Sequence, residues 1–316
     1  MTFVNVKQSK RVKADGVSDD TKALQACIDR AKNGGTVYFP DGVYLVSATL
    51  IFYSNQTLRF SDNAVILRSD KSETVTRYLL ASYSEPDWAG YSGTHDVIIS
   101  GGIFDGNEKL TERSTLINTV HCNNILIENC RFTHCALWHC IEINSTKNAT
   151  VRGCFFDGES YTVLCDKHRN ELLQLDCSLE GSYGPVYDYN GRLIDFCKDA
   201  TPCCDIEIYS YIFKCSGSPG VGHHGNSAHN NITIRNNIFD GPSGRDGYSR
   251  GYIIFQPDAY GIRVIDNAFI APSNPSSPSL GIIYENPDKK ALSAEGNRFT
   301  GHFDERIINR LYEEIL

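Results

Sequence analysis

Carboxylates and histidines recur in a series of short, strand-like stretches of the chain. Glu142 lies in WHCIEIN, Glu171 and Asp176 lie in ELLQLDC, and His223 and His224 lie in GVGHHGN. Two carboxyl groups in one groove can hydrolyse a glycosidic bond, because one protonates the leaving oxygen while the other, ionised, acts on water or on carbon. We therefore expect Asp176 to be general acid or base, Glu142 or Glu171 to be the second carboxylate, and His223 to support them.

The adjacent histidines leave three interpretations open: a zinc site, core or solvated side chains, or one histidine in a substrate groove. Neighbouring residues on a strand point to opposite faces, so His223 and His224 cannot both bind one zinc ion unless the backbone bends. We expect no metal and expect His223 to face the groove. Glu142 lies between two isoleucines and faces away from the core, so simple solvent exposure is its alternative interpretation.

A repeated phrase between these stretches must position them. Each copy has apolar residues at its second and fourth positions and a phenylalanine at its ninth, and the phenylalanine spacings are 28, 24, 57, 26, 30 and 30 residues. We interpret the spacing of 57 as two coils with one degenerate copy. The phenylalanines are Phe104, Phe132, Phe156, Phe213, Phe239, Phe269 and Phe299.

This pattern predicts an all-β fold, the parallel β-helix, because the strands are short and no helical pattern separates them. Coils of such a solenoid stack about 4.8 Å apart. Equivalent residues therefore form ladders: the phenylalanines make an interior stack, and Asn237, Asn267 and Asn297 lie in turns, where we expect them to bond local backbone. Glu142, Asp176 and His223 would then share one face, about 5 Å apart on adjacent coils and about 10 Å on alternate coils.

We predict one β-helix domain over residues 1–316. A capping helix covers residues 18–33, the coils run over about 36–301, and the amphipathic segment 303–316 forms a short C-terminal helix. The twelve cysteines are expected to be free and mostly buried, since a chain of this length needs no disulfide framework.

Composition excludes several partner classes. The formal net charge is -8, and no Lys/Arg cluster resembles a nucleic-acid-binding patch. No apolar run approaches the roughly 20 residues that span a bilayer, and the N-terminus lacks a signal-peptide pattern. We expect no nucleic acid and no membrane partner, and a location outside the cell or on a virion without a recognisable signal peptide, with the cytoplasm as the alternative.

The run DGVSDDTKALQACIDRA, followed by GGTVYFPDGVYLV, resembles the opening of pectate-lyase-like right-handed β-helix proteins, which include polygalacturonase-like hydrolases and phage tailspikes. The resemblance covers residues 15–46 closely, and the repeated phrase extends it to about Gly301. It implies a right-handed, single-stranded β-helix with a long polysaccharide-binding groove. Polygalacturonase-like enzymes place an acid, an acid pair, Gly-His-Gly and a basic motif on successive coils, and Glu142, Asp176, Gly222–Gly225 and Arg250 follow that order; the literal family signatures are missing.

Two segments that interrupt the repeat are expected to wall the groove, because insertions in solenoids often form the binding face. The first covers residues 157–201 and the second is GPSGRDGYSRG. The candidate substrate-binding residues are His224, Tyr187, Asp188, Arg192, Arg245, Asp246, Tyr248, Arg250, Gln256 and Glu285.

Three function classes remain. A polysaccharide hydrolase is favoured because acids dominate the candidate groove, and it needs no cofactor. A polysaccharide lyase would want a base such as Lys167, His168 or Arg192, often with Ca²⁺. A non-catalytic glycan-binding or virion-structural protein needs no paired acids. Tailspike-like relatives imply a homotrimer, although no coiled-coil heptads accompany it.

Overall fold

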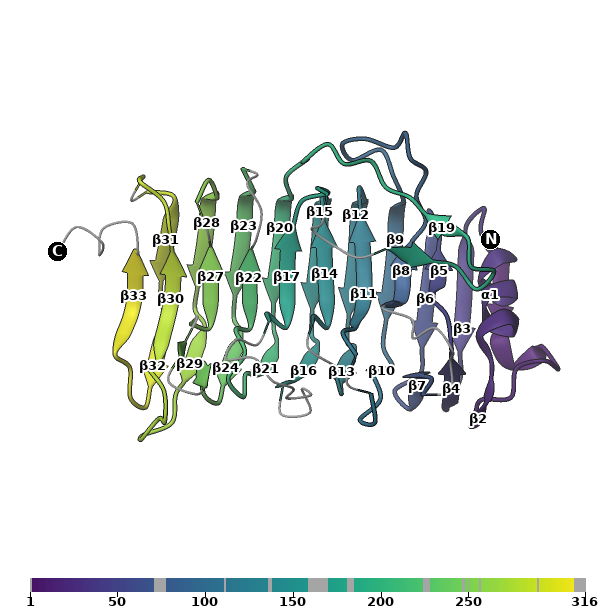
Figure 1. Cartoon of the computed structure of the whole chain (residues 1–316), viewed down its shortest axis with the longest axis horizontal. Helices are drawn as coiled ribbons and strands as arrows, with labels where there is room; N and C mark the ends of the chain where they lie inside the picture. The colour runs from purple at the N-terminus through teal and green to yellow at the C-terminus, as the bar shows by residue number, and fades with distance from the viewer. Residues whose placement is uncertain are drawn as a thin grey trace.

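Stacked coils of three strands make up the chain, which was analysed as a computed structural model. The structure describes residues 2–70, 78–110, 112–135, 138–158, 170–180, 185–223, 228–245, 248–249, 251–255, 257–288 and 290–309. Three long parallel sheets run the length of the stack (Figure 1), which confirms the right-handed parallel β-helix. Among the described residues, no helix has the length and apolar character that a membrane crossing requires.

The first sheet, sheet A, carries the second and fourth residues of each repeated phrase in the core. Its strands are β1 (Thr2–Asn5), β3 (Gly35–Phe39), β6 (Gln56–Phe60), β9 (His95–Ser100), β12 (Asn123–Glu128), β15 (Lys147–Arg152), β20 (Cys204–Tyr209), β23 (Asn230–Arg235), β28 (Tyr260–Ile265) and β31 (Leu292–Glu295).

Sheet B carries the phenylalanine of each phrase. Its strands are β2 (Asp15–Asp19), β4 (Gly42–Val46), β7 (Ala64–Arg68), β10 (Ile103–Asp105), β13 (Arg131–Thr133), β16 (Phe155–Asp157), β21 (Ile212–Lys214), β24 (Ile238–Asp240), β29 (Ala268–Ile270) and β32 (Arg298–Thr300).

Sheet C carries the acid-bearing stretches, which do form one parallel sheet as expected. Its strands are β5 (Leu50–Phe52), β8 (Tyr78–Ser82), β11 (Thr115–Val120), β14 (Ile141–Asn144), β17 (Leu173–Asp176), β22 (Val221–His223), β27 (Ile253–Phe255), β30 (Leu280–Tyr284) and β33 (Glu305–Asn309). Two short antiparallel hairpins, β18 (Val186–Tyr187) with β19 (Leu193–Ile194) and β25 (Gly244–Arg245) with β26 (Tyr248–Ser249), complete the strands.

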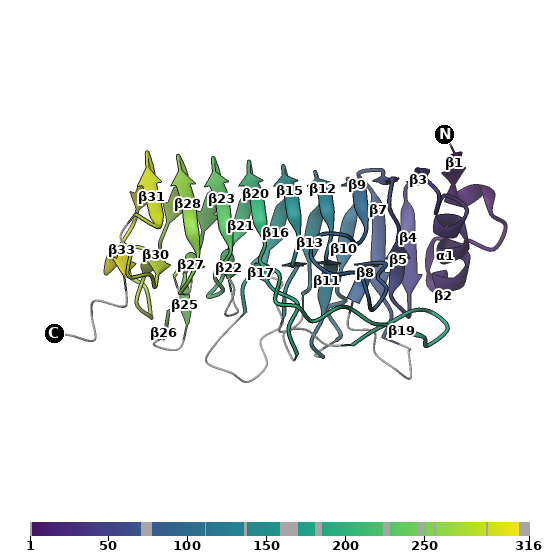
Figure 2. The same ribbon diagram turned by 90° about the horizontal axis from the view of Figure 1, so that it is seen from above.

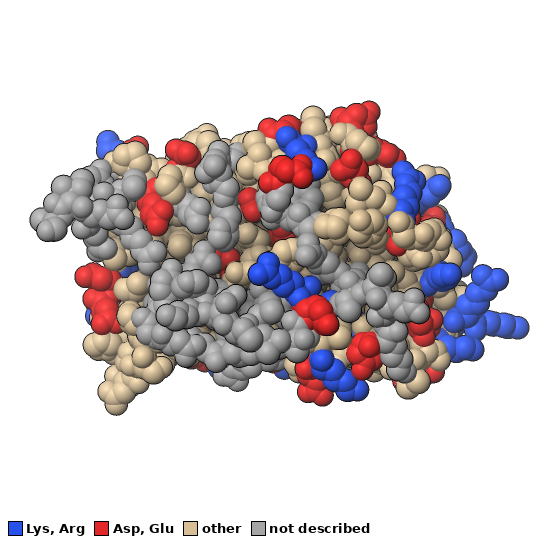
Figure 3. Space-filling model, in the orientation of Figure 1, with Lys and Arg blue, Asp and Glu red and all other residues tan. Residues whose placement is uncertain are grey.

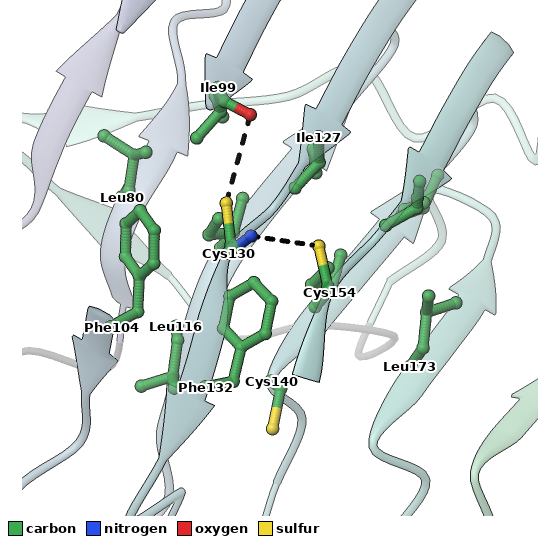
Figure 4. Close-up of a cluster of buried hydrophobic side chains, with 14 of the residues drawn as sticks. Leu80, Ile99, Phe104, Leu116, Ile127, Cys130, Phe132, Cys140, Cys154 and Leu173 are labelled. Atoms are coloured by element: carbon green, nitrogen blue, oxygen red, sulfur yellow. Dashed lines mark hydrogen bonds between the residues drawn. The ribbon is translucent and has the colours of Figure 1, made fainter. Parts of the chain in front are cut away.

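The phenylalanines form the predicted interior stack. Ring centroids of Phe156, Phe213 and Phe239 lie 4.6 and 4.7 Å apart in sequence order, and the rings are nearly parallel. Figure 4 shows the same stack at Phe104 and Phe132, beside the buried thiols of Cys130 and Cys154. The eleven cysteines among the described residues are all free and, apart from half-buried Cys197, buried, which agrees with the expectation.

The asparagines at the seventh position stack across coils instead of bonding only local backbone. Asn237 Nδ2 donates to Asn267 Oδ1 at 2.9 Å, and Asn267 Nδ2 donates to Asn297 Oδ1 at 3.0 Å. The left-handed backbone conformation falls one residue earlier, at Asn236 and Asp266. The turn is therefore fixed by a neighbouring residue, which leaves the buried amides free to link successive coils.

The interpretation of the 57-residue spacing as two coils is wrong. Strand β15 pairs directly with β20, and β16 pairs directly with β21, so Phe156 and Phe213 belong to adjacent coils. The extra residues are insertions on either side of β17 rather than a degenerate coil.

Both predicted end segments need correction. The capping helix α1 spans only Thr21–Asp29, because Ser18 and Asp19 belong to β2 and residues 30–33 form a turn. A 3₁₀ helix, η1 (Val6–Gln8), precedes it. At the other end, β33 extends sheet C where a helix was expected, since Ile307 and Ile308 pair with Ile282 and Ile283. Residues 310–316 of that segment lie outside the described part of the chain.

We predict that Phe213→Ala lowers the free energy of unfolding by about 3–5 kcal/mol, because the ring is fully buried between two others and its loss leaves a cavity. Urea denaturation followed by circular dichroism measures this change. Tyr260→Ala, at a ring that is 51% exposed, is the control and should cost less than about 1 kcal/mol. Equal losses of unfolding free energy in both variants would show that the aromatic stack contributes no more to stability than an exposed ring does.

Candidate active site

Polar side chains form adjacent columns on the outer face of sheet C. The first column consists of Asn118, Glu142 and Gln174, which pair in register on successive strands. Asn144 pairs with Asp176 in the second. Strand alternation sends these residues away from the core, whereas Ile141, Ile143, Leu173 and Leu175 between them are part of it.

Glu142 and Asp176 are both buried, at 2% and 3% exposure, so the interpretation of Glu142 as an ordinary solvent-exposed residue is excluded. Glu142 Oε2 accepts a hydrogen bond from Thr115 Oγ1 at 3.2 Å. Asp176 Oδ1 accepts one from the backbone N–H of Cys177 at 2.7 Å, and Gln174 Nε2 approaches Oδ2 at 3.5 Å. Backbone donors of this kind favour an ionised carboxylate.

The pKa of Glu142 is raised to about 7, mainly by burial and, to a smaller extent, by the negative charge of Asp176. The side chains of Asn144, Thr115 and Asn118 lower the pKa, but by less than desolvation raises it. Near neutral pH Glu142 can therefore hold a proton beside Asp176, whose negative charge favours that protonation. A protonated carboxyl group next to an ionised one is the arrangement that acid–base catalysis requires.

Glu171 supplies a third carboxyl group on the same face. A Cβ atom added at Gly222 would lie 2.1 Å from Glu171 Cγ and 2.9 Å from Glu171 Oε1. Gly222 pairs with Gln174 and so occupies the next position of the Glu142 column. The missing side chain of Gly222 is what makes room for Glu171 there. The carbonyl of Glu171 contacts Nδ1 of buried His139 at 2.7 Å.

Two buried amides flank Glu142 with unused hydrogen-bonding capacity. Asn118 and Asn144 are both 0% exposed; each lies close enough to Glu142 for its side chain to lower the pKa of that carboxyl group, and no other hydrogen-bond partner of either amide is found within the described part of the chain. Buried amides are normally paired, because an unpaired one costs about 1–3 kcal/mol. Donors and acceptors held in this way suit a ligand with many hydroxyl groups.

Residues 177–180 and 185–202, which we call the strap, cover the coils on the N-terminal side of these columns. Ile51 and Ala81 occupy the positions of the Glu142 column on the N-terminal coils, where the column is apolar. The strap packs against them through Val186, Ile194 and Phe196. Figures 1 and 2 both show β19 lying over the N-terminal strands of sheet C. The polar stretch of the column therefore begins where the apolar cover ends.

Buried contacts fix the strap to these coils. The ring nitrogens of His121 lie 2.7 Å from the carbonyl oxygens of Gly90 and Cys197, and Tyr91 Oη donates to the carbonyl of Pro202 at 2.8 Å. Beyond the acids, Figure 2 shows the β25–β26 hairpin on the same side of the solenoid as the strap.

The three strap residues expected to bind substrate lie on the β18–β19 hairpin over the N-terminal coils, not over Asp176. Asp188 Oδ1 accepts the backbone N–H groups of Asn190 and Arg192, so it shapes the hairpin turn. Arg192 lies 3.9 Å from Glu85, and Tyr187 is half exposed.

The expectation that His223 faces the groove is wrong. His223 pairs with Leu175, so alternation sends it to the core side, opposite to Glu142. Its ring centroid lies 4.2 Å from that of His229 and 6.0 Å from that of Phe255, and it is fully buried. His223 is therefore a core residue, and it cannot contact a sugar that binds on the outer face of sheet C.

The other predicted binding residues are only partly placed. Glu285 follows β30, and its backbone N–H donates to the carbonyl of Phe255 at 2.9 Å. The backbones of Arg245 and Tyr248 pair in the β25–β26 hairpin. His224, Asp246, Arg250 and Gln256 lie outside the described residues, as do Lys167 and His168.

The sequence-based prediction missed Asn118, Asn144 and Gln174, and it included Gly222 only as part of a Gly-His-Gly-like motif. An alignment of TLINTV, IEIN, LQLD and VGH in the observed register would have found them, because a polar residue or glycine recurs between core residues in each. Asn118 was missed because its stretch was not included among the acid-bearing ones.

In Figure 3, acidic and basic side chains of the described residues are interspersed over the coils, and basic side chains gather at the N-terminal end of the molecule. Within the described ranges, no group of three or more His, Cys, Asp or Glu side chains could hold a metal ion.

Comparisons with known proteins agree with this fold. Residues 3–172, more than half of the chain, match the family model described as rhamnogalacturonase A/epimerase, pectate lyase-like. The plasmin and fibronectin-binding protein A of Streptococcus pneumoniae is 31% identical over 180 residues, which are 50% of this chain and 24% of that protein. Alginate lyase 7 of Azotobacter vinelandii is 39% identical over 107 residues, 32% of this chain and 12% of that protein. The chain thus spans only a small part of these relatives.

Solved structures extend the likeness to nearly the whole solenoid. The crystal structure of the Streptococcus pneumoniae surface adhesin PfbA covers 97% of this chain and 93% of its own, with a TM-score of 0.65 and 18% identity. An exopolygalacturonase from Thermotoga maritima covers 93% of this chain and 75% of its own, with a TM-score of 0.50 and 13% identity. At these identities the likeness shows a shared fold.

We predict that Glu142→Gln stabilises the protein at high pH. The raised pKa means that the folded protein holds this proton more tightly than the unfolded chain, so the stability it contributes at low pH is lost as pH rises from about 4.5 to about 7. A neutral glutamine avoids that loss, which amounts to about 3 kcal/mol. Urea denaturation should show the variant more stable than the wild type at pH 8, with the difference vanishing by about pH 4. Glu207→Gln, an exposed carboxylate on sheet A, is the control, and a pH-independent difference would refute the shift.

We predict that Gly222→Ala destabilises the protein by about 1–3 kcal/mol, because the new methyl group would collide with the Glu171 side chain. The same substitution made in a Glu171→Ala background should cost much less. A double-mutant cycle of unfolding free energies measures this coupling. Additive losses would mean that Glu171 does not occupy this position.

Proposed function

Because the chain belongs to the pectate lyase-like rhamnogalacturonase A/epimerase family, we propose that it processes a polysaccharide and, specifically, that it is a glycoside hydrolase using Glu142 and Asp176. The observation that carries the proposal is a buried carboxyl group with a pKa raised to about 7 beside a second buried carboxylate on the same sheet face. Fold alone would not support a reaction, since one fold hosts many chemistries.

In this mechanism Glu142 is the general acid. It donates its proton to the glycosidic oxygen as the bond from that oxygen to the anomeric carbon breaks. Asp176, whose Oδ1 accepts the Cys177 N–H, acts in its ionised form and either removes a proton from the attacking water or attacks the anomeric carbon itself. Which of the two occurs is visible in the anomeric configuration of the first product.

The spacing of the two acids suits either course. Glu142 pairs with Gln174, and Asp176 lies two residues further along the same strand. Strand spacing and rise put the two Cα atoms about 8 Å apart. Catalytic carboxyl groups of glycosidases lie about 5–9.5 Å apart, and side chains that leave one sheet face in parallel keep a similar spacing.

Asn118, Asn144 and Gln174 would bind the sugar around the scissile bond. Their amides offer both donors and acceptors, and those of Asn118 and Asn144 have no partner among the described residues apart from Glu142. Glu171, whose side chain lies beside Gly222 of the next coil, would contact a neighbouring sugar or influence the charge of the pair. The strap would close the N-terminal end of this binding surface.

Elimination is the second candidate, favoured by the sequence likeness to alginate lyase 7. A lyase removes the proton beside a uronate carboxyl group and needs a base for this step. His223 cannot serve because it lies on the core side of sheet C. Adhesion without catalysis is the remaining alternative, since a relative is a surface adhesin.

We predict that Glu142→Gln and Asp176→Asn each lower polysaccharide cleavage by about 10²–10⁴-fold, since each removes one half of the acid–base pair. Wild type and variants are incubated with a panel of plant and capsular polysaccharides, and reducing ends and absorbance of unsaturated uronates are recorded. For the wild type, kcat/KM should fall as pH rises through about 7, because Glu142 then loses its proton.

Glu207→Gln is the matched control and should leave cleavage unchanged. New reducing ends without absorbance support hydrolysis, whereas absorbance establishes elimination. Binding without either signal establishes adhesion. Full cleavage by Asp176→Asn would refute this site.

A further inference from the structure

A second concave site lies on sheet B, away from the acids of sheet C. It is a cavity of about 470 Å³ on the outer face of the N-terminal coils. Leu45 and Leu67, which pair in register on adjacent coils, line its apolar side together with Val17, a valine that is 66% exposed. The volume falls within the range of small-molecule sites.

The next residue of the same column is polar. Asp105 pairs with Leu67, and its Oδ1 accepts the backbone N–H of Asn107 at 2.8 Å. The same oxygen lies 2.8 Å from Nδ1 of His134. The carboxylate therefore fixes the orientation of the imidazole in the cavity wall. Because the imidazole is already ordered, a ligand that binds to it loses less free energy to the ordering of side chains.

The charge of the lining disfavours an anionic ligand. Asp70, Asp105 and Glu108 line the cavity, whereas Lys109 is the one lysine or arginine among its described lining residues, and its Nζ lies 3.6 Å from Asp70 Oδ2. A divalent cation fits no better, since the described residues contain no group of three metal-binding side chains. Carboxylates beside an apolar surface instead suit a sugar ring, whose hydroxyl groups donate hydrogen bonds while its C–H groups cover apolar side chains.

We infer that this cavity is a second saccharide site, which binds a neutral sugar unit between Leu45/Leu67 and the Asp105–His134 pair. The site is separate from the proposed catalytic residues, because it lies on a different sheet, and it needs none of them to bind. It would hold a glycan on a surface where no bond is cleaved.

The test uses the Glu142→Gln protein, so that bound sugars are not hydrolysed, with methyl-labelled Val and Leu followed by NMR. The probes are cellohexaose, maltohexaose, xylohexaose, mannohexaose and, as the anionic comparator, hexagalacturonate. At least one neutral probe should shift the Val17, Leu45 and Leu67 methyl signals in a saturable way. Asp105→Ala and His134→Ala should each weaken that binding at least about tenfold.

Asp157→Ala is the matched control, because Asp157 lies at the same edge of sheet B two coils further on and outside the cavity lining. It should leave the affinity unchanged. If Asp105→Ala fails to fold, Val17→Glu replaces it, since this exposed position tolerates a charge and the carboxylate would fill the apolar side.

Three outcomes overturn the inference: no neutral probe shifts these methyl signals, hexagalacturonate binds there more tightly than any neutral probe, or the Asp105 and His134 variants bind as well as their parent. The signals are local to sheet B. Failure here is thus distinguishable from failure of the proposed hydrolase, which is judged by cleavage in the Glu142 and Asp176 variants.

Discussion

In-register parallel pairing between coils is the constraint on which the other features depend. Once the backbone of one coil bonds to the next, each side chain is fixed about 4.8 Å from its equivalent in the neighbouring coil. The phenylalanine stack, the asparagine ladder and the acidic column all follow from that one spacing. A single-residue shift in β14 would move Glu142 to the core side and Ile143 to the outer face.

Sheet C contains a polar stretch within an otherwise apolar outer column. Its outer column is apolar at Ile51 and Ala81, polar from Asn118 to Gln174, and apolar again at Ile254 and Ile283. Carboxyl groups buried in the middle of such a column lose hydration, and desolvation is the main reason that the pKa of Glu142 is raised. The solenoid therefore supplies both the alignment of the acids and the low-dielectric surroundings that separate their protonation states.

The repeat carried most of the information that could be predicted from sequence. Phe104 to Phe299 revealed the coils, and alternation around Glu142 and Asp176 revealed their outward direction, because both depend on local periodicity. His223 was assigned to the wrong side, since the phase of alternation through Gly222 depends on pairing with Leu175, a contact between residues 48 positions apart. The 57-residue interval was misjudged for a related reason: composition does not distinguish an insertion from a weak coil.

Glu171 was a candidate from the sequence, but the sequence could not reveal where its side chain lies. It precedes its strand, yet its side chain occupies space next to Gly222 on the following coil. No periodicity connects the two positions, and only the assembled sheet brings them together. The same holds for the strap, whose partners Gly90 and Tyr91 lie more than 100 residues earlier in the chain.

The strap also alters how the solenoid responds to stress. Coils of a repeat protein contact only their neighbours, so the ends of the stack can fray while the middle stays folded. The described parts of the strap, residues 177–180 and 185–202, leave the coil of β17, contact the coils of β5, β8 and β11, and return to β20. They therefore tie at least five coils into one cooperative unit, within which local opening at either end must also release the strap from the coils beside the proposed active site.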